Sequence, residues 1–443
     1  MAALGRARRA LLPMDPICSL SVRGFKSLRQ ECSVEVRPLT ILAGANSSGK
    51  SSIMQPLLLL KQTLEATYDP GSLKLDGPNV LFTSASQLLS HGSSDGSFSV
   101  MLATEGEERV RLVFRTSAEA GFDVVQTEYG DPAFVVRHDM SAADLSTVLE
   151  KQLRQLTHKG FGRPGDELRV QRDRCFLTVR LGRAGSQEFR GSFAILYPFV
   201  LEQQIRNVVH VPGYRGNPLR TYPGTPIGPE FPGTFQNYLA SVIHDWQEKK
   251  DARFAQLAGA LESLGLTWKV HVSRVDDTQL GIEVGRLPHS KRGGAYDLVS
   301  IADVGFGVSQ VLPVVVALLA AEKGQLVFIE QPEIHMHPKA QRQLAHLLAD
   351  AATRGARVVV ETHSSLLLLG VQALVAKGEL PPDMVKLHWF KRDPASGETQ
   401  ISSADLDNAG AFGDWPEDFG TVSLEAQGEY LDAAERKLAE ASQ

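Results

Sequence analysis

The sequence predicts an α/β fold built on a parallel sheet, and three segments carry this prediction. Residues 44–51 read GANSSGKS, which places two glycines, a lysine and a hydroxyl at P-loop spacing between a strand-like run at 39–43 and a helix-like run at 52–61. A second apolar run, 324–330, ends in Glu330, and a third, 356–362, ends directly before His363. Strands that deliver polar groups at their carboxyl ends are typical of an α/β sheet with a ligand site at that edge.

The residues of the P-loop predict phosphate binding. Its glycines let backbone N–H groups curl around phosphate oxygens, and the N-terminus of the next helix adds partial positive charge. Lys50 is expected to reach the β- and γ-phosphates of a nucleoside triphosphate, and Ser51 to hold Mg²⁺. The residues expected to surround the phosphates are Asn46, Ser47, Ser48, Gly49, Lys50, Ser51 and Ser52.

Composition and charge narrow the class of protein. Apolar content of 43% and charged content of 22% predict a folded chain, and a net charge of −5 gives no bulk support for nucleic-acid binding. Cys18, Cys32 and Cys175 are scattered and odd in number, so they predict neither a disulfide framework nor a zinc site and indicate a reducing cytoplasm. The longest apolar run, 311–321, is about half the length that spans a bilayer, so no membrane partner is expected.

The order of patterns predicts five parts. They are a flexible basic tail at 1–15, an N-terminal lobe with the P-loop at 16–100, an inserted β-rich and helical lobe at 101–295, a C-terminal lobe at 296–380 and a small C-terminal domain at 381–443. Within the inserted lobe, Ser141 is expected to cap a helix that reaches about residue 156, with Asp144 in its first turn. Residues 211–233 form a Pro/Gly-rich loop, and helical periodicity returns at 235–264.

Two further predicted helices complete the pattern, and the first has glycines at its start. Asp303 to Gln310 reads DVGFGVSQ before a helix without charge until Glu322, and glycines at a helix start present N–H groups to an anion. The strand that ends at Glu330 is stopped by Pro332, and a helix is expected from Pro338 to a glycine at 355.

This order of motifs resembles the ABC-type ATPase heads of SMC, RecF and overcoming-lysogenization-defect proteins. The stretches IEQPEIHMHP at 329–338 and ETHS at 361–364 resemble a branch of bacterial AAA-type ABC ATPases found in phage-defence neighbourhoods. LDNAG at 406–410 and WPEDF at 415–419 resemble a small C-terminal domain of that branch. The resemblance covers about 20–100 and 295–420, and the middle matches only loosely through residues 214–222. It implies an ABC-type P-loop ATPase head with an inserted β/α lobe and a small C-terminal domain, with ATP and Mg²⁺ as cofactors.

The resemblance also implies roles for single residues. Glu330 completes the Mg²⁺ shell begun by Ser51, and Gln87 stands at the Q-loop position as a further metal-side residue. Gly305, Gly307 and Ser309 form the signature segment that caps the ATP of a partner subunit, so two heads sandwich two nucleotides head to tail. The remaining positions are His337 in the D-loop, His363 as the switch histidine, and Arg23 and Lys26 near the adenine and phosphates.

Two positions depart from the family pattern. The glutamate that usually follows the acid of the strand, as general base for the attacking water, is here Gln331, whose amide positions water but accepts no proton. Either Glu333, two residues on, takes over as base, or the protein hydrolyses ATP slowly and works as an ATP-held clamp. Slow hydrolysis is favoured over near-inactivity. Gly305 replaces the signature serine, which leaves backbone N–H groups for the γ-phosphate contact.

Several residues of chemically reactive or charged types are also explained by structural roles. Glu333, His335 and His337 are metal-ligand types, but D-loop roles fit them better because no further ligand cluster closes a site. His210 and His289 are expected to be ordinary surface or loop residues, and Trp415 a packing anchor. The arginines within 206–220 either contact nucleic-acid phosphates, brace the Pro/Gly loop or sense nucleotide at a dimer face.

Three functions remain open on this evidence. The first is a nucleotide-gated switch in phage defence, in which a homodimer or larger assembly controls a separate effector such as a nuclease or toxin. No nuclease motif follows His363, so the effector is expected on another chain. The second is a RecF-like repair clamp that binds DNA directly. The third is a purely regulatory ATP-binding protein, a hypothesis that depends on Gln331.

Overall fold

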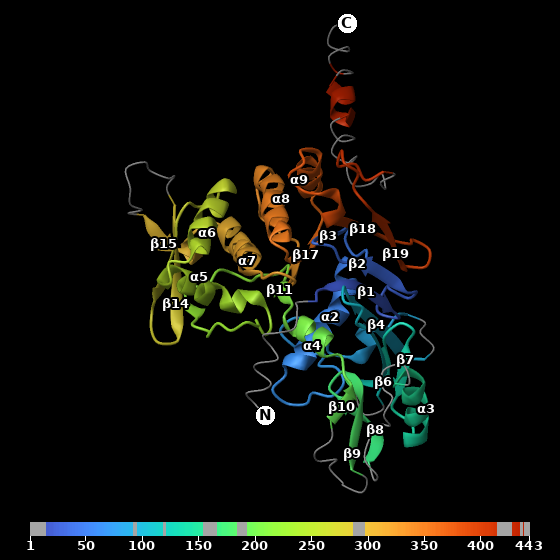
Figure 1. Ribbon diagram of the computed structural model, residues 1–443. Coiled ribbons are helices and arrows are strands. Elements are labelled where there is room, and N and C mark those ends of the chain that lie inside the picture. Colours follow the sequence, from blue (N-terminus) through green and yellow to red (C-terminus); the bar gives the residue numbers. More distant parts are fainter. Residues whose placement is uncertain are drawn as a thin grey trace.

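The computed structural model describes residues 15–91, 95–117, 121–153, 166–183, 193–286, 297–413, 428–434 and 437 (Figure 1). At its centre lies a six-stranded sheet in the order β11-β16-β17-β3-β18-β19, parallel throughout except for the β18–β19 pair. These strands are β3 (Leu39–Gly44), β11 (Val209–Val211), β16 (Leu326–Glu330), β17 (Arg357–Thr362), β18 (Val385–Arg392) and β19 (Thr399–Ala404). The predicted α/β class and all three predicted central strands are confirmed.

The strand order brings the predicted polar groups to one edge. β17 lies between β3 and β16, and its register pairs Glu361 with Glu330 on one side and Thr362 with Ala43 on the other. Because all three strands run parallel, the P-loop, Glu330 and His363 leave the sheet at the same end.

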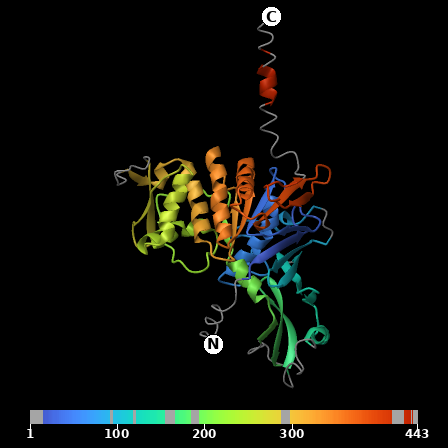
Figure 2. The same cartoon turned by 45° about the horizontal axis from the view of Figure 1, so that its top comes forward.

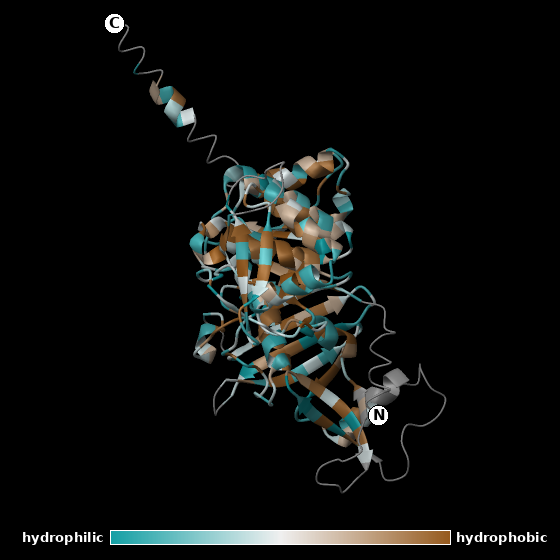
Figure 3. Cartoon of the chain, turned by 90° about the vertical axis from the view of Figure 1, so that its left-hand side faces the viewer, coloured by the Kyte–Doolittle hydropathy of each residue, from teal (hydrophilic) through white to brown (hydrophobic). Residues whose placement is uncertain are grey.

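Helices cover both faces of this sheet. Leu39, Ile41 and Val360 on one face pack in one apolar cluster with α7 (Phe306–Ala320), α8 (Pro338–Thr353) and α9 (Ser365–Ala376). Leu42 and Phe328 on the other face pack in a second cluster with α2 (Lys50–Glu65). Figure 3 shows hydrophobic ribbon segments gathered inside the body of the molecule. The strand β3 is buried along its whole length, which fixes the start of α2 and the loop before it.

An antiparallel sheet packs on the α2 side. Its order is β2-β1-β4-β5-β6-β7, with β1 (Ile17–Arg23), β2 (Cys32–Glu35), β4 (Ser97–Thr104), β5 (Arg109–Thr116), β6 (Phe122–Tyr129) and β7 (Phe134–Arg137). A three-stranded sheet, β10-β9-β8, extends from it at the bottom of Figures 1 and 2. Its strands are β8 (Asp166–Asp173), β9 (Phe176–Arg183) and β10 (Phe193–Leu196), flanked by α3 (Ala142–Leu153) and α4 (Phe199–Arg206).

A third unit packs against α7 at the left of Figure 1. It holds α5 (Leu239–Glu248), α6 (Ala252–Ser263) and a small antiparallel sheet of β12 (Tyr222–Pro223), β13 (Val270–Arg274), β14 (Gln279–Gly285) and β15 (Leu298–Ser300). Single 3₁₀ turns are η1 (Ala85–Gln87), η2 (Phe235–Tyr238), η3 (Ile301–Asp303) and η4 (Pro382–Met384).

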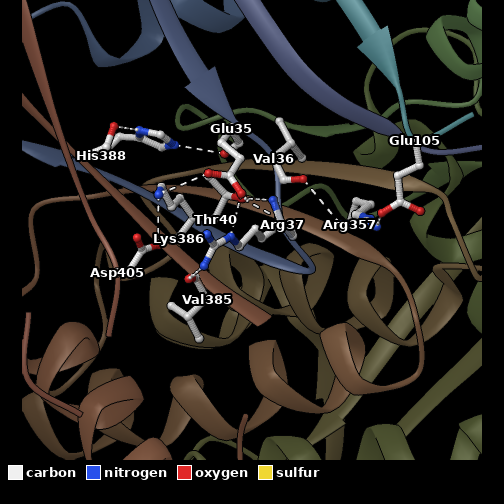
Figure 4. A network of polar contacts seen from close by, with 11 residues as sticks. Glu35, Val36, Arg37, Thr40, Glu105, Arg357, Val385, Lys386, His388 and Asp405 are labelled. Atoms are coloured by element: carbon white, nitrogen blue, oxygen red, sulfur yellow. Dashed lines mark hydrogen bonds and ion pairs between the residues drawn. The ribbon is translucent and has the colours of Figure 1, made fainter. Parts of the chain in front are cut away.

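A polar network joins the antiparallel sheet to the central one (Figure 4). Glu35, the last residue of β2, accepts a hydrogen bond from Arg37 at 2.7 Å and pairs with Lys386 of β18 at 3.1 Å. Arg37 and Lys386 each reach Asp405 at 2.9 Å. The ring of His388 bridges Ser403 Oγ at 2.8 Å and the Glu35 carbonyl at 2.9 Å. The two sheets are thus fixed to each other beside the strand that precedes the P-loop.

The predicted domain borders fall inside shared sheets. β4 crosses the predicted border at 100 and pairs with β1, while β18, beyond the predicted border at 380, pairs with β3. The predicted inserted lobe contributes strands to the antiparallel sheet, to the central sheet and to the two small sheets. Strand pairing between distant segments leaves no local mark in a sequence, and these borders were drawn from local composition.

Other local predictions can also be compared with the structure. Ser141 and Asp144 form a reciprocal cap at the start of α3, with Asp144 N donating to Ser141 Oγ at 3.2 Å and Ser141 N donating to Asp144 Oδ2 at 2.9 Å. The helical stretch predicted at 235–264 is interrupted at 249–251 between α5 and α6. The predicted tail up to residue 14, the end of the helix predicted to 156, His289 and Trp415 lie outside the described residues. Among the helices of the described residues, none combines the length and apolar character that a bilayer crossing requires.

Candidate functional site

The turn between β3 and α2 has the backbone of a phosphate cradle. Gly44 and Gly49 have φ values of 146° and 103°, which only glycine adopts without strain, and Ser47 lies at 59°. A Cβ atom on Gly49 would collide with Thr399 Oγ1, so the position excludes alanine on steric grounds as well. Residues of this kind turn successive N–H groups toward one side of a loop, where they bind an anion.

Lys50 opens α2 and folds back over this loop. Its Nζ donates to the carbonyl oxygens of Gly44 at 3.0 Å and Ala45 at 2.7 Å, and the residue is only 3% exposed. Burial lowers the pKa of Lys50, while the nearby carboxylates of Glu361 and Glu333 oppose that shift. An ammonium group that exchanges two carbonyl oxygens for phosphate oxygens keeps its hydrogen bonds and makes them stronger, since both partners are then charged.

The loop lines a cavity of about 720 Å³, a volume in the range of small-molecule sites. The predicted site residues that line it are Lys26, Asn46, Ser47, Ser48, Gly49, Lys50, Ser51, Ser52, Gln87, Gln331 and His363. Glu361 and, from the turn between β18 and β19, Arg392 and Glu398 also line it. Six separate segments of the sequence therefore contribute to one polar cavity.

The other predicted site residues lie elsewhere. Arg23 lines a neighbouring cavity of about 610 Å³ that shares Arg29 and Ser90 with the first. The predicted residues outside the lining of the P-loop cavity are Glu330, Glu333, Gly305, Gly307, Ser309 and His337. Gly305, Gly307 and Ser309 were predicted to cap the nucleotide of a second copy and His337 to lie in the D-loop at a dimer face, and their absence from the lining of their own cavity is compatible with those predictions.

Glu330 is hydrogen-bonded to groups other than the P-loop hydroxyl. Its Oε1 lies 3.2 Å from His210 Nε2, and its Oε2 accepts from Gly213 N at 3.0 Å. Burial by itself would raise the pKa of Glu330, but the hydrogen bond and charge of His210, the Gly213 N–H and Arg215 outweigh it and lower the pKa. Both oxygens of the predicted magnesium ligand are therefore already engaged.

The prediction that His210 is an ordinary surface or loop residue is wrong. His210 is 1% exposed in β11, where its ring stacks on Phe328 at 5.6 Å and contacts Asn79 Oδ1 at 3.1 Å. The register of β11 against β16 pairs His210 with Phe328, two residues before Glu330, and the His210 ring reaches Glu330 through Nε2. No local pattern in the sequence marks this pairing, because 120 residues separate the two side chains.

Gln331 and Glu333 occupy different places. Gln331 lines the cavity with a left-handed backbone, φ 43°, and its N–H donates to the Glu361 carbonyl at 2.8 Å. Glu333 is buried, and its Oε1 accepts from His363 N at 2.7 Å, while its Oε2 has no hydrogen-bond partner. Neutral Gln331 thus lies at the cavity, and the acid two residues on holds the backbone of His363.

Glu361 is a cavity residue that the sequence analysis did not single out. Ser51 Oγ donates to Glu361 Oε1 at 3.0 Å, whereas Oε2 is buried without a partner. Burial raises the pKa of Glu361 to about 7, and the negative charges of Glu330 and Glu333 add to this against the opposing Ser51 hydrogen bond and Lys50 charge. The available signal was one acidic residue at the end of the otherwise apolar run 358–360.

Lys26, a predicted nucleotide contact, and Gln87, a predicted metal-side residue, both border the cavity. Lys26 Nζ donates to Gln55 Oε1 at 2.6 Å and lies 4.5 Å from the centre of the Phe82 ring, and burial lowers its pKa. Gln87 accepts from Thr83 N at 2.9 Å and donates to Thr83 Oγ1 at 3.0 Å. Its amide is engaged within its own turn, and its contact with a metal stays a prediction.

The signature segment forms an exposed surface next to the D-loop. Gly305 is the N-cap of α7 and offers no side chain to its free N–H groups. Phe306 is 51% exposed, and its ring lies 5.9 Å from that of His335. His337 caps α8, its Nδ1 accepting from Lys339 N at 3.2 Å. This surface presents an apolar ring and a helix N-terminus outward.

The arginines of the Pro/Gly-loop region are paired within the chain. Arg206 contacts Glu202 at 2.8 Å, and Arg220 contacts Asp303 at 2.7 Å. Arg215 donates to the Glu330 carbonyl at 2.6 Å. Of the three interpretations left open, these contacts support bracing of the loop.

A divalent cation fits the P-loop edge by its donor chemistry. The Ser51 hydroxyl and the Glu361 carboxylate, whose Oε2 is buried without a partner, are hard oxygen donors of the kind that Mg²⁺ prefers. Elsewhere, across the described stretches of the chain, no three His, Cys, Asp or Glu side chains gather into a group that could hold a metal by themselves. The metal-like types at Glu333, His335 and His337 therefore do not form such a group.

Two family models match the chain. Residues 16–109 match an "AAA ATPase domain", and residues 211–369 match the model described as "AAA domain, putative AbiEii toxin, Type IV TA system". The first match covers the P-loop and the second covers Gln331, Glu361 and His363. The two matches support a nucleotide-binding P-loop ATPase domain, and no curated protein matches the chain.

Solved structures with some similarity are heads of SMC proteins. An Smc head bound to the C-terminal winged-helix domain of ScpA is 14% identical, covers 89% of this chain and 99% of its own, and has a TM-score of 0.46. The SMC head domain from Thermotoga maritima is 11% identical over 88% and 100%, with a TM-score of 0.39. The Smc head with an extended coiled coil from Pyrococcus furiosus, bound to the C-terminal domain of ScpA, is 11% identical over 97% and 100%, with a TM-score of 0.42. At these values the likeness supports no conclusion about partners.

Proposed function

We propose that the chain binds ATP and hydrolyses it slowly, as a head of the ABC-type group to which SMC and RecF proteins belong. The observation that carries the proposal is a single cavity in which the P-loop, Gln331 and His363 meet. Matches to AAA ATPase domains on both sides of this cavity support the same activity.

Each cavity residue has a role that its position supports. The P-loop N–H groups and Lys50 hold the β- and γ-phosphates. His363 is neutral at pH 7, because burial and the Lys50 charge lower its pKa, and it can donate one ring N–H to a γ-phosphate oxygen. Gln331 orients water but accepts no proton, so the step that needs a base is slow. Mg²⁺, when bound, offsets the phosphate charge.

The switch is proposed to be a head-to-tail homodimer or a higher assembly of such dimers. Gly305, Gly307, Ser309 and His337 lie away from the cavity of their own chain, so contact with a nucleotide requires a second copy. The exposed Phe306 beside the uncapped start of α7 gives that copy an apolar contact and an anion-binding helix end.

The biological role proposed is control of a separate effector, a nuclease or toxin, in cytoplasmic phage defence. The resemblance of residues 329–338 and 361–364 to a defence-associated branch supports it, as does a matching family model whose description names a type IV toxin–antitoxin system. A RecF-like DNA clamp needs a free basic surface. Arg206 and Arg220, by contrast, are used in ion pairs within the chain.

Removal of the P-loop ammonium tests the activity directly. Lys50→Ala is expected to weaken binding of a fluorescent ATP analogue in Mg²⁺ by about a hundredfold or more, since it loses two charge-assisted hydrogen bonds worth about 1.5–3 kcal/mol each. Lys377→Ala, at an exposed lysine that ends α9, is the matched control and should bind as the wild type does. Unchanged affinity in Lys50→Ala would contradict the assignment of the site.

A further inference from the structure

Glu361 stands where the carboxylate partner of the P-loop hydroxyl is expected. Its Oε1 accepts from Ser51 Oγ at 3.0 Å, and Ser51 is the hydroxyl that a P-loop places on the cation. Glu361 is 4% exposed, yet its Oε2 has no hydrogen-bond partner. A buried carboxylate oxygen without a partner is costly, and a cation beside it removes that cost.

Glu330, the acid that the family pattern assigns to cation binding, is already hydrogen-bonded to other groups. His210 and the Gly213 N–H engage its two oxygens, and Arg215 holds its carbonyl. Glu330 is absent from the lining of the P-loop cavity, whereas Glu361 belongs to it. To reach the cation, Glu330 would have to give up two hydrogen bonds, while Glu361 would gain a partner for its free oxygen.

The strand order places the two acids at different distances from the P-loop. Glu330 and Glu361 are register partners at the ends of β16 and β17, and β17 is the strand next to β3. An acid on β17 is one strand closer to the P-loop than an acid on β16. On its other side β16 pairs with β11, and His210 of β11 contacts Glu330 Oε1 at 3.2 Å.

We propose that Glu361, together with Ser51, holds the divalent cation of the bound nucleotide, and that Glu330 is a structural acid that anchors the loop of Gly213 and Arg215. This assignment rests on the proposed function, since it concerns the cation of the same nucleotide. Loss of Glu361 should therefore affect the contribution of Mg²⁺ to nucleotide affinity, and loss of Glu330 should affect stability instead.

The test compares nucleotide affinity with and without the cation. A fluorescent ADP analogue is titrated in Mg²⁺ and in EDTA for the wild type, Glu361→Gln and Glu330→Gln, with a thermal melt for each protein. ADP is used so that the readout is independent of turnover. The wild type should bind more tightly in Mg²⁺. In Glu361→Gln that gain should fall by roughly tenfold to a hundredfold, the range seen when residues around a metal are lost, with affinity in EDTA unchanged.

Glu330→Gln should keep the gain from Mg²⁺ and lower the melting temperature. Glu361→Asp keeps the charge and retracts the oxygens by one methylene, so it should show a partial loss even if Glu361→Gln folds poorly. Retention of the full gain in a folded Glu361→Gln, or an equal loss in Glu330→Gln, overturns the assignment while leaving ATP binding intact. A wild type that binds no nucleotide in either buffer overturns the proposed function itself.

Discussion

Lys61, the second of two buried lysines in α2, offers a prediction whose size follows from its contacts. Lys61 is 0% exposed, forms an ion pair with Glu65, and donates to the carbonyls of Arg206 at 3.1 Å and Phe231 at 3.2 Å. Glu65 also accepts from Gly233 N at 2.9 Å. Burial lowers the pKa of Lys61 and raises that of Glu65, so each charge depends on the other.

Lys61→Met keeps most of the side-chain volume and removes the ammonium. It leaves Glu65 as a buried acid with one remaining donor and leaves two carbonyls unpaired. Breaking a buried pair in this way costs about 3–5 kcal/mol of the free energy of unfolding. Replacing both partners, in Lys61→Met with Glu65→Leu, should cost less than the sum of the two single changes, with a coupling of about 0.5–3 kcal/mol.

The assay is urea unfolding of the wild type, both single variants and the double variant, with the exposed Lys377→Met as control. Nucleotide affinity is the second readout. It should stay within about tenfold of wild type, because Lys61 lies about 16 Å along α2 from Lys50 at 1.5 Å per residue. A loss below about 1 kcal/mol in Lys61→Met, or strict additivity in the double variant, would refute the reasoning about this pair.

Three further predictions follow from the site and its surroundings. Gln331→Glu places a proton acceptor at the cavity and should raise the rate of phosphate release by roughly a hundredfold or more. Gln400→Glu, at an exposed position, is the control and should leave the rate unchanged. An unchanged rate in Gln331→Glu would contradict the role of a missing base. Gly307→Glu should block ATP-dependent dimerisation, measured by light scattering, while the affinity of the monomer for ATP stays unchanged. Dimers of normal affinity would contradict the predicted role of Gly307 in capping the nucleotide of a second copy. Burial lowers the pKa of His388, so the unfolded chain takes up a proton near pH 6.5 that the folded chain refuses. Stability should therefore be lost as the pH falls below about 6.5, and a urea midpoint that falls equally in His388→Gln would contradict this origin.

The sequence predicted the parts of the fold that local patterns encode. The P-loop, the three central strands and the cap at Ser141 each depend on residues within one short segment, and the structure confirms them. Parallel strands end at the same edge of a sheet, so the three strand predictions were enough to expect Lys50, Gln331 and His363 at one site, and all three line one cavity.

Local sequence patterns could not predict contacts between segments that are far apart in the sequence. Whether Glu330 or Glu361 meets Ser51 depends on strand order and on His210, which comes from a third segment. Likewise, the pairing of β18 with β3 joins segments almost the whole chain apart, so a border at residue 380 looked natural in composition alone. Buried polar groups are the residues for which such pairing matters most, because each must find its partner across the fold.

The measurement that tests the central claim most directly is mass by light scattering with and without ATP and Mg²⁺, run beside phosphate release. The mass of the wild type should rise from that of one 48.2 kDa chain toward that of a dimer or a larger assembly only when nucleotide is present, and phosphate should be released slowly. The mass of Lys50→Ala should be the same with and without nucleotide. A mass that does not depend on nucleotide, with brisk phosphate release, would contradict the nucleotide-gated switch.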